Sequence, residues 1–325
     1  MHPDRSWLRP LGGLVILGVL VWRVGAGAFV DALRHVDARS VAMAAAIALV
    51  TTVCGAWRWL LVARGLGTEL SLRSAVAECY RSQFLNVTLP GGVLGDVHRG
   101  VRHGRDGGDL GRGLRSVVWE RSAGQVVLFA ITLGAVLVLP SPASSLPWAE
   151  TVLPAALLAS GAVAVAAVLA VLAVRSGRLR ESALPVRVAR GAVADVRAGL
   201  LGRHTWPGVV AVSSVAVSGH VATFVLAARS AGVTASVSSL VPLALVVLVA
   251  MALPLNIAGW GPREGAAAWV FGLAGLGAAG GVGTAVVYGI MAFVAALPGA
   301  ALLVVSRRER ARTQPVLATE GAAGA

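Results

Sequence analysis

The sequence has few charged residues and no lysine. Charged residues make up 13% of its 325 residues and hydrophobic residues 57%, whereas a soluble domain carries about 25% charged residues. So few charges cannot cover a surface that faces water, and this excludes an ordinary soluble protein. All 28 basic residues are arginine, an imbalance to which we assign no mechanism.

Cysteine is also scarce. Cys54 and Cys79 are the only two, both lie in or beside apolar segments, and no CxxC pair occurs. We therefore expect no disulfide framework, no metal site and no cofactor. The glycine-rich stretch Gly91-Gly92-x-x-Gly95 lacks the Lys-Ser/Thr of a P-loop, and this argues against a nucleotide site.

Long apolar stretches are what the sequence does contain. No Asp, Glu or Arg occurs in residues 151–174, 230–262 or 265–306, and one membrane span needs about 20 apolar residues. The pattern predicts an all-α, polytopic integral membrane protein of about eight transmembrane helices with one or two re-entrant or broken segments. The predicted spans are residues 8–28, 40–62, 117–139, 151–174, 206–228, 238–258, 264–279 and 283–305, with a turn at 280–282.

The distribution of arginine predicts the orientation in the membrane. Three arginine-rich segments alternate with three that contain no arginine: residues 64–115, 175–203 and 307–312 against 141–150, 230–237 and 280–282. Because basic loops stay in the cytoplasm, we expect a prokaryotic plasma-membrane protein with both termini cytoplasmic. We expect one transmembrane domain over residues 1–312 and a disordered cytoplasmic tail over 313–325.

The net charge of +13 bears on the partners. Because the arginines lie in loops between apolar segments, the charge predicts attraction to anionic lipid headgroups. A soluble protein with this charge would suggest nucleic-acid binding, but no nucleic-acid module occurs in the sequence. We therefore expect membrane lipids and no nucleic acid as partners.

A first interrupted segment lies in residues 77–105. Pro90, Gly91 and Gly92 break any helix there, because proline removes a hydrogen-bond donor and glycine relaxes the backbone; Gly95 follows. A broken backbone at membrane depth persists only where protein buries it or where it lines a wet cavity. This predicts a re-entrant hairpin. A cytoplasmic loop with a glycine-rich turn is the alternative.

Polar residues flank this break at helical spacing. Gln83 and Asn86 share one helical face before it, and Asp96 and Arg99 share one face after it. Transporters use such broken helices to aim polar groups at a substrate. In the alternative interpretation, Asp96 and Arg99 are a solvated charge pair.

Other polar residues lie within predicted spans. Glu120 and Arg121 stand at the start of the third span, where they either serve function or extend to the interface. Arg58, between two tryptophans, is typical of an interfacial anchor. We expect His220 to hydrogen-bond to a neighbouring helix.

A second interrupted segment repeats the pattern near the other end of the chain. It contains Pro254, Asn256, Gly259, Gly261, Arg263 and Glu264. Arg263 and Glu264 are the only charged residues between Arg229 and Arg307, so they must pair, reach the interface or face a cavity. Two such elements in two halves of a chain point to a site between structural repeats. The alternative is a tight cytoplasmic turn.

Taken in order, these residues resemble a known family. The pattern is Gln83-x-x-Asn86-x-x-x-Pro90-Gly91-Gly92-x-x-Gly95-Asp96-x-x-Arg99, then Glu120-Arg121, then Pro254-x-Asn256-x-x-Gly259-x-Gly261-x-Arg263-Glu264. It resembles the lysylphosphatidylglycerol synthase transmembrane-region family, also described as flippase-like domains, over roughly residues 10–306. Two positions differ: Glu120 stands where the family pattern has Asp, and Leu94 where it commonly has Gly.

The resemblance implies a domain that flips or accommodates a phospholipid or a polyprenyl-linked lipid. In the family's two-part enzymes a separate soluble domain transfers lysine. This chain ends soon after its last predicted span, so we do not expect aminoacyl transfer. We predict a lipid translocase with no catalytic residues, in which Arg99 and Arg263 hold a lipid phosphate and Asp96 and Glu264 position them.

The predicted site has two sets of residues. The substrate-binding candidates are Gln83, Asn86, Asp96, Arg99, Arg121, Asn256, Arg263 and Glu264. The backbone breaks are Pro90, Gly91, Gly92, Gly95, Pro254, Gly259 and Gly261. Two alternatives remain: a membrane glycosyl or lipid-phosphate transferase that uses a polyprenyl carrier, and a non-catalytic accessory subunit of a lipid-modifying partner enzyme.

Overall fold

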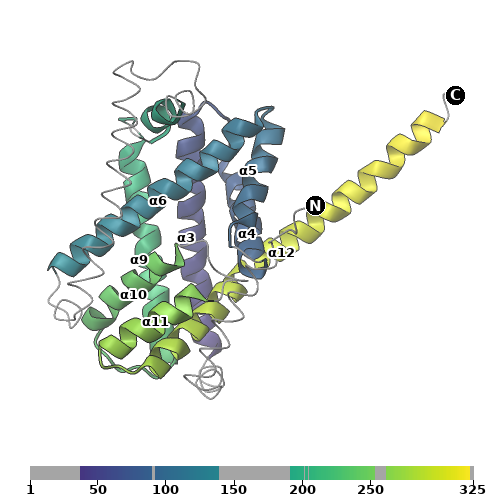
Figure 1. Ribbon diagram of the computed structural model, residues 1–325. Coiled ribbons are helices and arrows are strands. Elements are labelled where there is room, and N and C mark those ends of the chain that lie inside the picture. The colour runs from purple at the N-terminus through teal and green to yellow at the C-terminus, as the bar shows by residue number, and fades with distance from the viewer. Residues whose placement is uncertain are drawn as a thin grey trace, which may run out of the picture.

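The computed structural model of the protein is helical throughout the part of the chain that it describes (Figure 1). Those residues are 37–89, 92–138, 191–200, 202–203, 205–252 and 261–322, and no strand occurs in them. The predicted all-α fold is therefore confirmed. Predicted spans 8–28 and 151–174 lie outside the described residues, so the count of eight stays a prediction.

Three described helices are long and apolar enough to cross a membrane. They are α3 (Ala38–Gly65), α9 (Trp206–Ser230) and the Ala278–Ser306 part of α12 (Ala278–Ala322). They coincide with predicted spans 40–62, 206–228 and 283–305. Their outer faces expose large apolar side chains, which suits contact with lipid rather than water. These include Met43, Leu49, Val50, Val210, Val215, Phe293, Leu297 and Val304.

The first interrupted segment forms a helical hairpin. α4 (Leu72–Thr88) ends just before the predicted break, and α5 (Leu94–Asp106) begins just after it; Pro90 and Gly91 lie outside the described residues. Arg102 contacts Glu78 near the open end, and Asp96 contacts Ser82 near the tip, so the two helices run antiparallel. The end of α5 therefore lies beside the start of α4, near the Gly65 end of α3.

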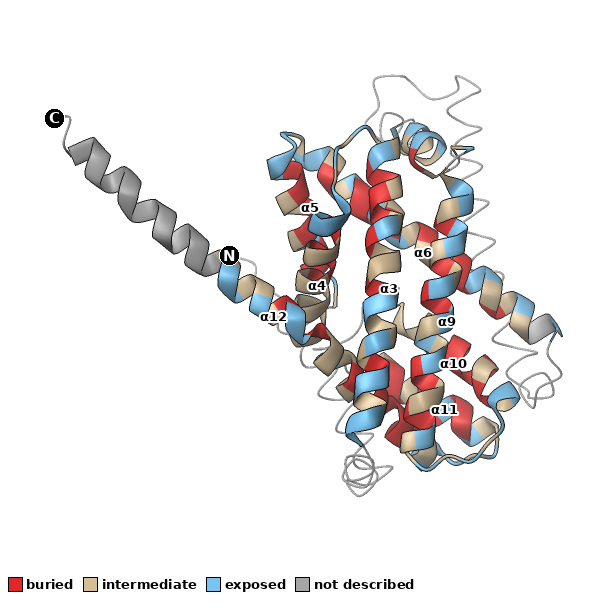
Figure 2. Ribbon diagram, turned by 180° about the vertical axis from the view of Figure 1, so that it is seen from behind, coloured by how far each residue is buried: buried red, intermediate tan, exposed pale blue. Residues whose placement is uncertain are grey.

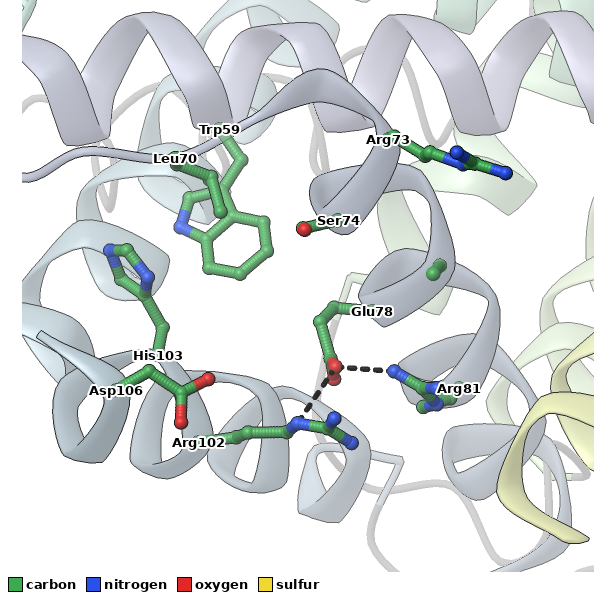
Figure 3. A pocket seen from close by; sticks show the side chains of 10 residues that line it. Trp59, Leu70, Arg73, Ser74, Glu78, Arg81, Arg102, His103 and Asp106 are labelled. Atoms are coloured by element: carbon green, nitrogen blue, oxygen red, sulfur yellow. Dashed lines mark hydrogen bonds and ion pairs between the residues drawn. The ribbon is translucent and has the colours of Figure 1, made fainter. Parts of the chain in front are cut away.

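Close helix packing holds the hairpin in place. A Cβ atom at Gly299 of α12 would lie 2.1 Å from the backbone oxygen of Tyr80 in α4, so only glycine permits this approach. On its other side the hairpin packs against the Gly65 end of α3. There, Trp59 and Leu70 form part of the wall of a pocket that charged residues of α4 and α5 complete (Figure 3).

The second interrupted segment also lies between two helices, α10 (Val237–Met251) and α11 (Pro262–Leu273), which pack on each other. Figure 1 shows α10 and α11 towards the lower end of the molecule, whereas α4 and α5 lie beside the upper part of α3. Residues 253–260 lie outside the described residues, and with them Pro254, Asn256 and Gly259. The two helices are shorter than predicted spans 238–258 and 264–279.

The position of the turn before α12 corrects the sequence analysis. The predicted turn at 280–282 is wrong, because α11 ends at Leu273 and α12 already begins at Ala278. Gly275 and Gly277 have φ angles of 72° and 83° and make the turn, since glycine adopts positive φ without steric cost. Gly281 instead lies inside α12, where a Cβ would come within 2.2 Å of the Ala267 oxygen in α11.

Two further helices complete the described fold. α6 (Leu110–Val138) crosses the bundle and begins seven residues before predicted span 117–139, and η2 (Val196–Leu200) packs on the Gly65 end of α3. The largest core lies where α9, α10, α11 and α12 meet, around Phe224 and Phe271, whose ring centroids are 6.2 Å apart. Figure 2 shows buried residues concentrated along these contacts and exposed residues on the outer faces.

Candidate functional site

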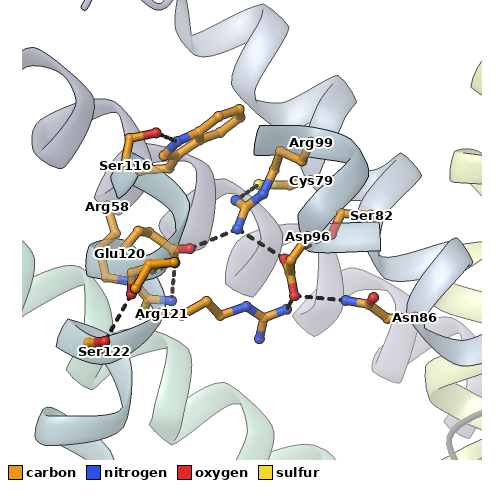
Figure 4. Close-up of polar contacts among 12 residues, drawn as sticks. Arg58, Cys79, Ser82, Asn86, Asp96, Arg99, Ser116, Glu120, Arg121 and Ser122 are labelled. Carbon is orange, nitrogen blue, oxygen red and sulfur yellow. Dashed lines mark hydrogen bonds and ion pairs between the residues drawn. The ribbon is translucent and has the colours of Figure 1, made fainter. Parts of the chain in front are cut away.

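A buried network of charged side chains joins α3, α5 and α6 (Figure 4). Glu120 of α6 is at its centre. One oxygen of its carboxylate accepts hydrogen bonds from Nε of Arg58, at 2.8 Å, and from Nη2 of the same guanidinium. The other oxygen accepts a bond of 2.8 Å from Arg99. Glu120 thus binds arginines from two different helices.

Asp96 extends the network to the tip of the α4–α5 hairpin. Its carboxylate accepts hydrogen bonds from Ser82 at 2.9 Å, Asn86 at 3.0 Å and Arg99 at 3.1 Å, and it also forms an ion pair with Arg121. Asp96 therefore receives donors from α4, α5 and α6. Four predicted site residues, Asn86, Asp96, Arg99 and Arg121, are brought together here.

Gly95 makes this geometry possible. Its backbone N–H donates to the side-chain oxygen of Asn86 at 2.8 Å. A Cβ at this position would lie 2.0 Å from the Ser82 oxygen, a distance that no real side chain tolerates. The absence of a side chain at Gly95 therefore lets α5 approach α4 closely enough for Asp96 to reach Ser82 and Asn86.

The network carries an excess of positive charge, and its side chains differ in how far they are exposed. Arg58, Arg99 and Arg121 bring three positive charges, and Asp96 and Glu120 bring two negative ones. The side chains of Arg99 and Glu120 are only 4% and 3% exposed, whereas that of Arg121 is 48% exposed. Buried charges need opposite charges around them. Arg121 is thus the arginine of the network that can contact a ligand with little rearrangement.

A second ion pair lies at the start of α11. Nε of Arg263 donates to Glu264 at 2.8 Å, and the other carboxylate oxygen of Glu264 accepts the backbone N–H of Gly261 at 2.7 Å. Both charged side chains are enclosed, with 6% and 0% exposure. Arg263 also lies over the ring of Tyr288, 5.7 Å from its centroid. Gly261, at φ 119°, adopts a backbone conformation that favours glycine.

His220 and Tyr288 join α9 to the second ion pair. Nδ1 of His220 in α9 lies 3.1 Å from the hydroxyl of Tyr288 in α12, which confirms the predicted hydrogen bond to a neighbouring helix. Arg58 of the first network donates a hydrogen bond of 3.2 Å to Ser213, which lies in the same helix as His220. On the other side, Tyr288 supports Arg263. Helix α9 therefore contacts both charged clusters through polar side chains, Ser213 at the first and His220 at the second.

Removing the Tyr288 hydroxyl tests this connection. Tyr288→Phe keeps the ring under Arg263 but loses the bond to His220, so we expect the free energy of unfolding to fall by about 1 kcal/mol, as for one hydrogen bond. Denaturant unfolding of the purified protein in detergent measures it. Phe224→Leu, in the same aromatic cluster but without a polar group, gives the cost of changed packing alone. A Tyr288→Phe protein as stable as the unmodified one would contradict the connection.

Two outcomes differ from the sequence analysis. Gln83 does not join the network but donates to Thr52 of α3 at 3.1 Å. The interpretation of Arg58 as an interfacial anchor is wrong, because its side chain binds Glu120 and Ser213 inside the protein. Gly124, one turn after Glu120, leaves room for this contact, because a Cβ there would lie 2.8 Å from the Arg58 guanidinium.

Comparison with known proteins agrees with the resemblance noted from the motifs. Among the described residues, no group of three His, Cys, Asp or Glu side chains is placed to hold a metal ion. No curated protein and no solved structure matches the chain. The family profile of the lysylphosphatidylglycerol synthase transmembrane region matches residues 6–299, nearly the whole chain. The protein therefore belongs to the lysylphosphatidylglycerol synthase transmembrane-region family and is a multi-pass membrane protein of lipid-related function.

Proposed function

We propose that the protein translocates a lipid with an anionic headgroup, a phospholipid or a polyprenyl-linked lipid, across the plasma membrane of a prokaryote. Both termini lie in the cytoplasm, as the arginine distribution predicts. The observation that carries the proposal is the accessible Arg121 at the edge of an otherwise buried network with one excess positive charge. Such charges are costly inside a membrane and mark substrate pathways.

The phosphate of the headgroup binds Arg121 in this proposal. Guanidinium groups form paired hydrogen bonds with phosphate oxygens, and Asp96 already fixes the orientation of Arg121. Arg99 is enclosed between Asp96 and Glu120 and acts by positioning their carboxylates. This division refines the initial hypothesis that Arg99 and Arg263 both hold the phosphate directly.

The second ion pair serves a later position on the same path. Arg263 and Glu264 lie at the interrupted end of α11, and Tyr288 joins them to His220 of α9. A headgroup that leaves Arg121 would therefore meet polar groups rather than hydrocarbon. Such a path removes part of the cost of moving a charged headgroup through the membrane.

Replacing Arg121 tests the proposal. Arg121→Gln keeps a polar side chain but removes the charge that binds phosphate, so we expect the rate of lipid translocation to fall by at least about tenfold, equivalent to about 1.4 kcal/mol. The measurement is the movement of fluorescent phosphatidylglycerol between leaflets of vesicles that contain the purified protein.

Matched variants separate charge from folding. Arg121→Lys keeps the charge and should recover much of the rate. Arg105→Gln removes an exposed arginine of α5 and should leave the rate unchanged. Unchanged translocation in folded Arg121→Gln protein would reject the headgroup site. Product formed from a labelled sugar nucleotide would favour the transferase alternative, and translocation that requires one copurified enzyme would favour the accessory subunit.

A further inference from the structure

A pocket of about 290 Å³ lies between the Gly65 end of α3 and the open end of the α4–α5 hairpin. It is separate from the tip of the hairpin, where Asp96 lies. Trp59, Leu70 and Ala77 give it an apolar side, and His103 stands edge-on to Trp59 with ring centroids 5.3 Å apart. The other lining residues are Arg73, Ser74, Glu78, Arg81, Arg102 and Asp106 (Figure 3).

Glu78 fixes two arginines at this pocket. One oxygen of its carboxylate accepts a hydrogen bond of 2.5 Å from Arg81 of α4 and an ion-pair contact of 3.1 Å from Arg102 of α5. Arg81 is held further by a bond of 2.8 Å to Ser306 of α12. Two guanidinium groups from different helices are thus oriented before any ligand binds, which reduces the entropy that binding costs.

The charges on this side of the pocket do not balance. Arg73, Arg81 and Arg102 bring three positive charges, and Glu78 brings one negative charge, an excess of two. Asp106 lowers the excess for the whole pocket to one; Figure 3 shows it below His103 and beside Arg102. Burial lowers the pKa of His103, so its ring is neutral at pH 7 and the excess belongs to the arginines.

Two buried polar atoms at these residues also lack hydrogen bonds within the described part of the chain. They are the second carboxylate oxygen of Glu78 and Nε of Arg81. Buried polar groups nearly always have a partner, and an exception indicates a ligand or water. Both atoms are themselves enclosed, so they fit a buried water behind the pocket wall rather than direct contact with a ligand.

We propose that this pocket is a second phosphate-binding site that takes a phosphate ester, either as part of a lipid headgroup or as a small soluble molecule. Phosphate matches both the charge excess and the geometry of guanidinium groups. The apolar side contacts the carbon part of the ester, and the volume is at the small end of the range for ligand pockets. The site does not depend on lipid translocation.

Trp59 gives the pocket a physical connection to the first network. Its ring lines the pocket and also lies under Arg99, whose guanidinium carbon is 4.6 Å from the ring centroid. Its indole N–H is fixed by Ser116 at 3.0 Å. Trp59 is itself fully buried, so it links the two regions through packing rather than through direct contact with a ligand.

Binding of radiolabelled inorganic phosphate and of glycerol 3-phosphate to the purified full-length protein in detergent tests the proposal by equilibrium dialysis. A lipid arm uses nanodiscs of phosphatidylcholine with and without phosphatidylglycerol and counts retained lipid by native mass spectrometry. Binding of the soluble probes assigns a soluble phosphate ester, and retention of phosphatidylglycerol alone assigns a lipid headgroup. No binding in either arm overturns the proposal.

Variants locate the binding. Arg73→Gln combined with Arg102→Gln should weaken it by about tenfold or more, because both remove charge from the pocket while Arg81 keeps its bond to Glu78. Arg105→Gln, which removes one exposed arginine of α5 outside the pocket, is the control for loss of positive charge elsewhere on the same helix. Arg121→Gln should bind the soluble probes normally even where translocation is lost, and in the lipid arm it should lose only the lipid held at the first network. Equal affinity of the double variant and the control, or loss of the soluble probes in Arg121→Gln but not in the double variant, overturns the proposal.

Discussion

Replacing Glu120 with alanine is expected to lower the free energy of unfolding by about 3–5 kcal/mol, the cost of removing one partner from a buried charge pair. Glu120 is the carboxylate that both Arg58 and Arg99 bind, and it is almost fully enclosed. Without it, Arg58 keeps Ser213 as a partner and Arg99 keeps Asp96, but three arginines share one carboxylate. The protein should then unfold at markedly lower temperature, or fail to fold in the membrane.

The length of the side chain provides the control. Glu120→Asp keeps the negative charge and shortens its reach, so we expect a smaller loss of stability than in Glu120→Ala. Thermal unfolding in detergent, followed by circular dichroism, compares the two with the unmodified protein. If Glu120→Ala proved as stable as the unmodified protein, the network would not contribute to the fold, and its arginines would have to be neutralised in some other way.

Much of this fold follows from local sequence patterns. Uninterrupted apolar runs predicted α3, α9 and the Ala278–Ser306 part of α12 within about five residues. The break between α4 and α5 followed from Pro90 and the adjacent glycines, because their backbone chemistry ends a helix in any context. The turn before α12 was misplaced because several glycines lie close together, and the sequence does not show which of them make the turn. Packing against Ala267 shows that Gly281 stays helical.

The candidate site was only partly predictable. Asp96 and Arg99 are three residues apart on one helix, so their pairing follows from helical geometry. Arg58 and Glu120 are 62 positions apart, and nothing local predicts that they meet. Gln83 and Asn86 share a helical face as predicted, but α4 lies between two neighbours, so Gln83 bonds to α3 and Asn86 to α5. Which neighbour each side chain meets is decided by the arrangement of the helices.

Adding one methyl group at Gly95 should disrupt the site as a whole. In Gly95→Ala the new Cβ would fall 2.0 Å from the Ser82 oxygen and 2.8 Å from the Asn86 side-chain oxygen, so α5 must move away from α4. Overpacking of this kind costs about 1–3 kcal/mol of stability. The movement also separates Asp96 from Ser82 and Asn86, so we expect lipid translocation to fall by at least about tenfold, the effect of about 1.4 kcal/mol.

A glycine-to-alanine substitution at an open position distinguishes steric strain at Gly95 from the general effect of alanine in a helix. Gly134 lies inside α6, where a Cβ would meet nothing within 4 Å, and alanine at a helix interior is favoured over glycine by about 1 kcal/mol. Gly134→Ala should therefore be neutral or slightly stabilising, with unchanged translocation. Gly95→Ala protein with normal stability and transport would mean that the hairpin tip adjusts freely. Asp96 would then not need its present partners in order to hold Arg121 at the headgroup site.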